Sequence, residues 1–197
     1  ARQYMIDLIE MLQPKKVVVN YGNHDLRFQN YLAKNLDTDL LELMPKTSLE
    51  LIFVDGFNHY NKELHTKVHY DPLIDVFKDS GIEIVYNDTW FSFVGETIFV
   101  HPLAYSSGML KTAEKAYRYF KDNDYFFDTI VMAHTHKTGH YDIGNSVIYE
   151  QGCCCETSKM DYADGKLTPS QREGFILVYQ DKFGRLNEDK THIVRLN

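Results

Sequence analysis

Apolar residues along the chain follow two spacings, one helical and one continuous or alternating. Helical spacing predicts a helix over Arg2–Gln13, which Pro14 ends, and another from Pro72 to Gly81. Two further stripes predict helices that turn these side chains inward: Phe28, Tyr31, Leu32 and Leu36 in one, and Met109, Ala113, Ala116, Tyr117 and Phe120 in the other. Ser106-Ser107-Gly108 is expected to cap the last of these helices.

Short apolar runs between the helices predict strands. The runs cover Val17–Val19, Leu51–Val54, Ile82–Tyr86, Trp90–Val94, Ile98–Val100, Thr129–Ala133, Tyr141–Ile143, Val147–Glu150, Phe175–Tyr179 and His192–Leu196. The last two runs are expected to form a hairpin across Asp181–Gly184. Helices come early in the chain and hairpins late, which is typical of a mixed α/β (α+β) fold built in layers.

Composition and charge narrow the class of protein. The chain has 197 residues, 44% of them hydrophobic and 25% charged, a globular balance that predicts one domain over residues 1–197. Its 21 basic and 28 acidic residues give a formal charge of −7, which disfavours a protein that coats duplex nucleic acid through a basic face. No apolar run approaches the ~20 residues of a membrane span, and no signal-peptide pattern is present, so we expect no membrane partner.

The three cysteines, Cys153, Cys154 and Cys155, stand in a row. An odd, adjacent trio is a poor disulfide framework and is typical of a reducing compartment, so we expect a cytoplasmic protein. Adjacent side chains point in different directions, which argues against a zinc site built from all three. The simplest expectation for this segment is a cysteine-rich strand end or loop.

Histidines follow three of the predicted strands at the point where each strand ends. Val17–Asn20 runs into Asn23-His24-Asp25, Ile98–Val100 into His101, and Thr129–Ala133 into His134-Thr135-His136. Binding and catalytic groups gather where the carboxyl ends of strands meet loops, because the scaffold is rigid there. Imidazole nitrogens and the Asn23 amide oxygen suit borderline ions such as Mn²⁺, Fe²⁺ or Zn²⁺. We therefore expect the side chains at 23, 101, 134 and 136 to converge on one ion-binding pocket.

These motifs resemble those of the calcineurin-like metallophosphoesterases. Gly22-Asn23-His24-Asp25 is similar to the family's GNH(D/E) motif, His101 to its lone histidine motif, and Ala133-His134-Thr135-His136 to its GHxH motif. Motif order and strand context agree from about Val17 to the C-terminus. The resemblance implies two packed mixed β-sheets flanked by helices, and an enzyme that hydrolyses a phosphomonoester or a phosphodiester.

The resemblance also implies a role for each residue. Asn23, His101 and His134 would bind one ion of a two-metal centre, and His136 would bind the other. His24 would protonate the leaving oxygen, and Asp25 would hold its imidazole in orientation. Arg27 falls where some members contact phosphate, and a guanidinium fork suits phosphate oxygens. The implied cofactors are two divalent transition-metal ions (Mn, Fe or Zn), and the implied partner is a phosphate-ester substrate, with nucleotides and nucleic acids among the candidates.

Two motifs of the family are missing from this chain. D-x-H and G-D-x-x-D, which supply most of the other ion's ligands and the bridging carboxylate, have no counterpart, and Arg2–Gln13 occupies the place of the helix that follows them. We therefore expect the chain to be the C-terminal portion of a longer metallophosphoesterase whose N-terminal βαβ segment supplies the further ligands. By itself the chain is expected to retain metal weakly and to turn over slowly.

Other interpretations of the same residues stay open. His24 could cap a backbone carbonyl, His134 and His136 could be exposed loop residues, and His101 could be a hydrogen-bonded core histidine. Arg27 could equally be a solvated residue of a helix face. The whole domain could be a binding or scaffold module that kept the fold and lost the chemistry, or a one-metal structural or sensor domain.

Overall fold

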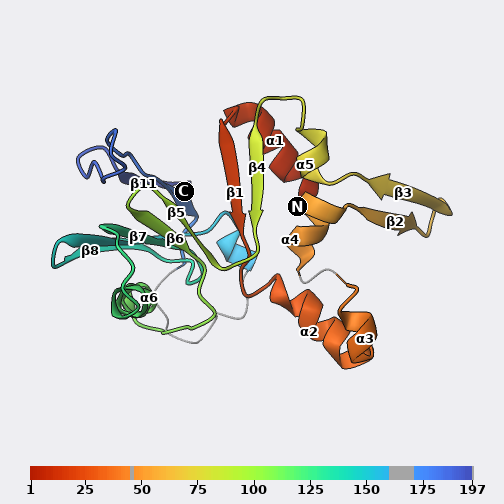
Figure 1. The fold of residues 1–197 in the computed structure, drawn as a ribbon, viewed down its shortest axis with the longest axis horizontal. Coiled ribbons are helices and arrows are strands. Elements are labelled where there is room, and N and C mark those ends of the chain that lie inside the picture. Colours follow the sequence, from red (N-terminus) through yellow and green to blue (C-terminus); the bar gives the residue numbers. More distant parts are fainter. Residues whose placement is uncertain (45–46, 160–170, 197) are drawn as a thin grey trace. The chain divides into compact units, whose positions relative to one another are not determined.

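The structure, a computed structural model, describes residues 1–44, 47–159 and 171–196. The chain divides into two compact units, Ala1–Thr89 and Trp90–Asn197, here called unit 1 and unit 2 (Figure 1). Each unit has sheets and buried apolar clusters of its own, so each is described by itself. That residues 1–197 form a single domain stays a prediction, because it depends on how the two units join.

Unit 1 combines short helices with two two-stranded sheets. In chain order its elements are α1 Arg2–Leu12, β1 Lys16–Asn20, α2 Leu26–Asn35, α3 Thr38–Leu41, α4 Ser48–Glu50, η1 Leu51–Asp55, β2 Phe57–Asn61, β3 Thr66–Tyr70, α5 Leu73–Val76 and β4 Glu83–Asn87. Strands β1 and β4 are parallel, and β2 and β3 form an antiparallel hairpin. The predicted helix at the start of the chain and the strands at Val17–Val19 and Ile82–Tyr86 are confirmed.

The core of unit 1 lies among α1, η1, α5 and β4. Its buried members are Ile9, Phe53, Leu73, Phe77 and Ile84. Val17 and Val19 of β1 pack against this cluster while remaining half-buried. The parallel pair β1–β4 is therefore held mainly by helices packed on it, which is how parallel strands are normally covered.

Three sequence predictions in unit 1 are wrong in part. Leu51–Val54 is a π-helical segment, because the Thr47 hydroxyl accepts a bond from the Glu50 amide (3.0 Å) and starts α4, which runs directly into η1. A continuous apolar run does not distinguish a strand from a helix. Tyr31 is 66% exposed since it lies at the edge of the apolar stripe on α2. The helix predicted from Pro72 ends early, at Val76.

Unit 2 is built around one five-stranded mixed sheet with the strand order β5-β6-β7-β9-β8. Its elements are β5 Phe91–Val94, β6 Thr97–Val100, α6 Lys111–Asp122, β7 Thr129–Met132, β8 Thr138–Ile143, β9 Ser146–Gln151, the short 3₁₀ helix η2 Thr157–Lys159, β10 Gly174–Leu177 and β11 His192–Arg195. The central strands β6, β7 and β9 are parallel, and the outer strands β5 and β8 are antiparallel to their neighbours.

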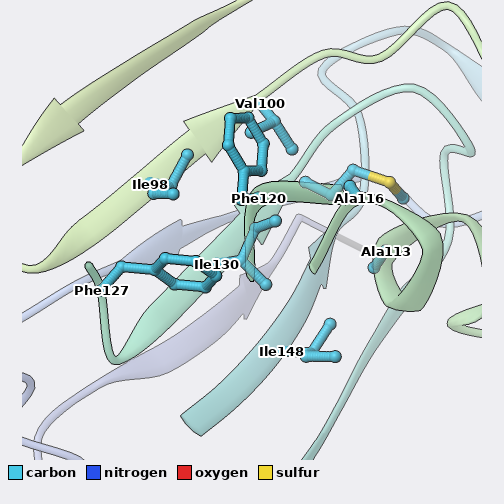
Figure 2. Packing of buried hydrophobic residues seen from close by; sticks show 9 residues of the cluster. Ile98, Val100, Ala113, Ala116, Phe120, Phe127, Ile130 and Ile148 are labelled. Atoms are coloured by element: carbon cyan, nitrogen blue, oxygen red, sulfur yellow. The ribbon is translucent and has the colours of Figure 1, made fainter. Parts of the chain in front are cut away.

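Each face of this sheet is covered by a different element. Helix α6 lies on one face, where Phe120 packs on side chains of β6, β7 and β9 (Figure 2). The hairpin β10–β11 packs on the other face, where Ile176 and Ile193 contact the cluster containing Val131 and Tyr149. Alternation along β9 explains the division, because successive side chains of a strand point to opposite faces. Unit 2 thus has three layers, helix, mixed sheet and hairpin.

The fold confirms the predicted class, a mixed α/β protein with several sheets flanked by helices. The predicted hairpin near the C-terminus is confirmed as β10–β11. The predicted cap of α6 is wrong: the helix begins at Lys111, and the Ser106 amide donates to the Thr112 hydroxyl (2.8 Å). Among the described residues, every helix is too short or too polar to cross a bilayer.

Candidate functional site

The Gly22-Asn23-His24-Asp25 motif forms a tight turn directly after β1. The Asp25 amide donates to the Gly22 carbonyl (3.1 Å), and the Gly22 amide donates back to the Asp25 carboxylate (2.8 Å). The other carboxylate oxygen accepts from the Ser48 hydroxyl (2.9 Å). Because both oxygens of Asp25 are used in this way, the carboxylate braces the turn from two sides.

The turn exposes the side chain that the resemblance implies as the general acid. His24 and Arg27 are exposed, and their side chains approach to 3.3 Å, between the imidazole Nε2 and the guanidinium Nη2. The hydrogen bonds given for Asp25 in the described structure go to Gly22 and Ser48 rather than to His24. Arg27 lies beside the His24 imidazole, and the predicted orientation of His24 by Asp25 stays a prediction.

Sequence reasoning missed a second set of polar groups at the same edge of the β1–β4 pair. Asn20 and Asn87 end the two strands opposite each other, and the Asn87 amide donates to the Asn20 side chain (3.2 Å). The Tyr86 hydroxyl meets the fully buried Thr47 hydroxyl at 2.6 Å. Burial is the main cause that raises the pKa of Tyr86, while the Thr47 bond lowers it. The sequence signal for these groups is an asparagine at the end of each strand, Asn20 after one apolar run and Asn87 after the other.

Unit 2 brings two of the predicted metal ligands together. His101 follows β6 and His134 follows β7, and these strands are adjacent and parallel, with Val100 opposite Met132. The two imidazole rings lie edge to face with centroids 5.3 Å apart. The Tyr105 ring packs edge-on against His134 at 6.0 Å. Pairing of the two strands brings their loops together. His101 follows Val100 directly, and His134 follows Met132 after Ala133, whose amide donates to the Val100 carbonyl (3.0 Å).

The loop that carries His134 and His136 has an unusual backbone. His134 has φ 109° and His136 has φ 59°, a region that residues with a Cβ seldom adopt. The His136 carbonyl accepts from the Arg172 amide (2.7 Å), and its Nδ1 lies 3.4 Å from the Gln171 amide nitrogen. Residues in sparsely populated backbone regions persist only when their surroundings fix them, and they cluster at functional sites.

The donor chemistry of these residues fits a borderline divalent cation in part. Two neutral imidazoles at this separation suit Mn²⁺, Fe²⁺ or Zn²⁺. Across the described ranges, no three side chains of His, Cys, Asp or Glu gather as an ion-binding cluster, although an amide ligand such as Asn23 falls outside that set. Asn23 belongs to unit 1 and the imidazoles to unit 2, so the expected convergence of all four ligands stays a prediction.

The cysteine trio lies at a strand end, as predicted. Cys153 follows β9, and its amide donates to the Arg172 carbonyl (3.1 Å). Cys154 and Cys155 are exposed, and all three thiols are free. Burial raises the pKa of Cys153 and of Cys154, so neither has the lowered pKa of a reactive thiolate.

No protein-family model matches the chain, and no curated protein matches it. Among solved structures, the chain is similar to a crystal structure of a single mutant of Vps29 from Entamoeba histolytica. The identity is 15%, the match covers 59% of this chain and 69% of that one, and the TM-score is 0.34.

Proposed function

We propose that this chain is the motif-bearing part of a metal-dependent phosphoesterase, which hydrolyses a phosphomonoester or a phosphodiester with a histidine as general acid. The observation that carries the proposal is the pairing of His101 and His134, 5.3 Å apart at the ends of adjacent parallel strands. Two histidines that follow separate strands, 33 positions apart along the sequence (134 − 101), become neighbours because the two strands are adjacent and parallel and their loops leave the same edge of the sheet. The motifs that resemble the family occur at these same positions.

Within this proposal the residues of each unit have separate tasks. His101, His134 and His136 with Asn23 would hold the divalent ions, which when bound supply hydroxide at neutral pH and neutralise phosphoryl oxygens. His24 would donate a proton to the leaving oxygen, which its exposed position at the tip of the turn permits. Arg27 would contact a phosphate oxygen and is already placed beside the His24 ring.

Hydrolysis of mono- and bis-p-nitrophenyl phosphate tests the proposal. The assay uses the protein expressed from the whole coding frame that contains this chain, with Mn²⁺, Fe²⁺ or Zn²⁺ added. Loss of a general acid costs about 10²–10⁴-fold in rate, so we expect His24→Ala to lower kcat by that order. His59→Ala, which alters an exposed histidine on β2, is the control and should retain activity. Metal-dependent turnover that is equal in both variants would contradict the proposed role of His24.

A second candidate is a binding module that has the fold without the chemistry. It is favoured by the lack of a cluster of three His, Cys, Asp or Glu ligands within the parts of the chain that the structure describes. Metal analysis of the same protein separates the candidates. Two equivalents of transition metal per chain support the phosphoesterase, and metal-free protein after growth in supplemented medium supports the binding module.

A further inference from the structure

Two buried groups of opposite charge, which no hydrogen bond joins in the described part of the chain, lie behind the histidine loop of unit 2. Glu150, on β9, is 0% exposed, and Lys137, the residue after His136, is 2% exposed. Attraction to Lys137 lowers the pKa of the Glu150 carboxyl, but burial outweighs it and the pKa is raised. Charged groups are rarely this deeply buried, because removing them from water is costly. Apolar packing alone therefore does not explain why these two charged side chains are buried.

Lys137 reaches across to the loop that follows His101. Its ammonium donates to the Ser107 carbonyl (2.6 Å) and lies 3.4 Å from the Gly108 carbonyl. The same nitrogen lies 5.7 Å from the centre of the Tyr105 ring. One cation, on the residue next to His136, thus contacts three residues of the segment between His101 and α6.

Glu150 acts on the other end of that segment. The Leu110 amide and the Thr135 hydroxyl are close enough to lower the pKa of the Glu150 carboxyl. Among the described residues, neither forms a hydrogen bond of good geometry with it. Leu110 is the N-cap of α6 and provides no side-chain cap. An anion near a helix N-terminus is stabilised by the unpaired amides and the helix dipole. Glu150 therefore adds a buried negative charge from β9 at this N-terminus, where Glu114 of the first turn is already paired with Lys111 and Arg118.

The backbone around the pair is strained at three places. His134 (φ 109°), His136 (φ 59°) and Leu110 (φ 58°) all have positive φ without being glycine. Thr135, between the two histidines, is 4% exposed, and its hydroxyl is one of the groups acting on Glu150. The strained residues thus adjoin groups that Glu150 or Lys137 contacts. Such strain persists only where surrounding contacts over-determine the conformation.

We propose that the Glu150–Lys137 pair is a positioning device: it holds the segment after His101 against the His134–His136 loop and so fixes the directions of the paired imidazoles. In its consequence for metal binding, the inference rests on the proposed function. Buried ion pairs are seldom retained for stability, since apolar residues of similar volume often serve as well. Groups behind metal-binding histidines typically set the direction of the ring.

The chain provides a matched control for Lys137. Lys121, near the other end of α6, also donates to a backbone carbonyl, that of Phe127 (2.8 Å), and lies over the Phe127 ring at 4.1 Å. Lys121→Met removes a similar anchor whose contacts are with Phe127 and Tyr117 rather than with the histidine loop. Lys137→Met removes the anchor beside His136.

The test measures ring geometry and Co²⁺ affinity in the protein expressed from the whole coding frame that contains this chain. In metal-free wild-type protein we expect a nuclear Overhauser effect between the His101 and His134 rings, which Lys137→Met should abolish and Lys121→Met should preserve. Loss of such a supporting group lowers metal affinity about 10–100-fold, so the Kd for Co²⁺ should rise by that factor in Lys137→Met alone. Unchanged ring contacts in Lys137→Met would overturn the inference. Absence of Co²⁺ binding by wild type would count against the proposed function, while the ring contacts still decide the positioning role.

A double variant separates positioning from stability. Lys137→Met combined with Glu150→Leu leaves no unpaired buried charge, so the thermal midpoint should return towards that of wild type. If the pair positions the histidines, the double variant should regain stability while the ring contact stays absent and the Co²⁺ affinity stays low. Recovery of both together with the midpoint would show that the pair serves only the fold, and would overturn the inference. The double variant also carries the test if Lys137→Met fails to fold.

Discussion

The two units place histidines at strand ends by different physical means. In unit 1 the motif closes its own turn, with the Gly22 amide bonded to the Asp25 carboxylate three positions away. In unit 2 the histidine loop depends on groups that are distant in the sequence, such as the Lys137 ammonium bonded to a carbonyl 30 positions away. The polar groups of unit 1 are mostly near solvent, whereas Glu150 and Lys137 are buried.

This difference determines how each site responds to change. A local turn needs little from the rest of the fold, because its bonds close over a few residues and order little chain. A loop with positive φ at two non-glycine residues needs outside support, and that support fails when the layers behind it loosen. Substitutions in the core should therefore affect the histidines of unit 2, and substitutions in the turn should affect those of unit 1.

The largest effect is expected from Phe120→Ala in the core of unit 2. Phe120 is fully buried between α6 and the sheet (Figure 2). Its ring contacts those of Trp90 and Phe91. Truncating such a side chain costs about 3–5 kcal/mol. The fluorescence of Trp90, which is the single tryptophan, follows denaturation of this unit. Phe126→Ala, at a residue 79% exposed, should stay within about 0.5 kcal/mol of wild type; a similar loss in both would contradict the packing described.

The sequence predicted the parts of the site that local rules govern. The strand ends before His24, His101 and His134 followed from apolar runs, and β6 and β7 are adjacent, with the His101 and His134 rings near each other. The sequence did not predict that, among the described residues, β1 and β4 form a two-stranded sheet of their own in unit 1. Parallel pairing is set by distant chain segments, and a short apolar strand does not specify its partner.

The support behind the histidines could not be predicted for the same reason. Glu150 was included only as the end of an apolar run, and its burial depends on α6, 28 or more positions away (150 − 122), covering that face of the sheet. Lys137 follows the predicted loop His134-Thr135-His136. Because lysine is rarely buried, the sequence did not predict its burial. Leu51–Val54 shows a further limit, since Thr47 capping rather than the apolar pattern decided its helical form.

A smaller effect is expected from Gly56→Ala in unit 1. Gly56 has φ 73°, and a Cβ there would lie 2.7 Å from the Tyr70 carbonyl oxygen, a backbone atom of β3. Conformational strain of this kind costs about 1–3 kcal/mol, and the contact adds to it. Gly81→Ala is the matched control, because Gly81 has φ 77° with open space around its Cβ position. Urea denaturation should show the greater loss for Gly56→Ala; equal losses would mean that strain alone matters.

A comparable loss is expected in the Asp25 turn. Asp25→Ala removes the acceptor for both the Gly22 amide and the Ser48 hydroxyl, and each hydrogen bond to a charged group is worth about 1.5–3 kcal/mol, with the lower end expected here because Asp25 is only half-buried. Ser48→Ala removes one neutral partner and should lose about 1 kcal/mol. Hydrogen exchange of the Gly22 amide reports the turn directly. Greater protection in Asp25→Ala than in Ser48→Ala would contradict the bracing role.

The smallest effect concerns Glu114, a half-buried residue with exposed partners, in contrast to the fully buried Glu150. Bonds from Lys111 and then Arg118, one turn away on α6, lower the pKa of Glu114 from 4.5 to about 2. Since this pKa is lower than in the unfolded chain, the stabilisation is present above about pH 4.5 and is lost as the pH falls towards 2. Carbon NMR of the carboxyl should show that midpoint, and molar salt should move it back towards 4.5 because exposed pairs are screened. A midpoint insensitive to salt would contradict this expectation. It would mean that the Glu114 pairs are shielded from solvent, as Glu150 and Lys137 are.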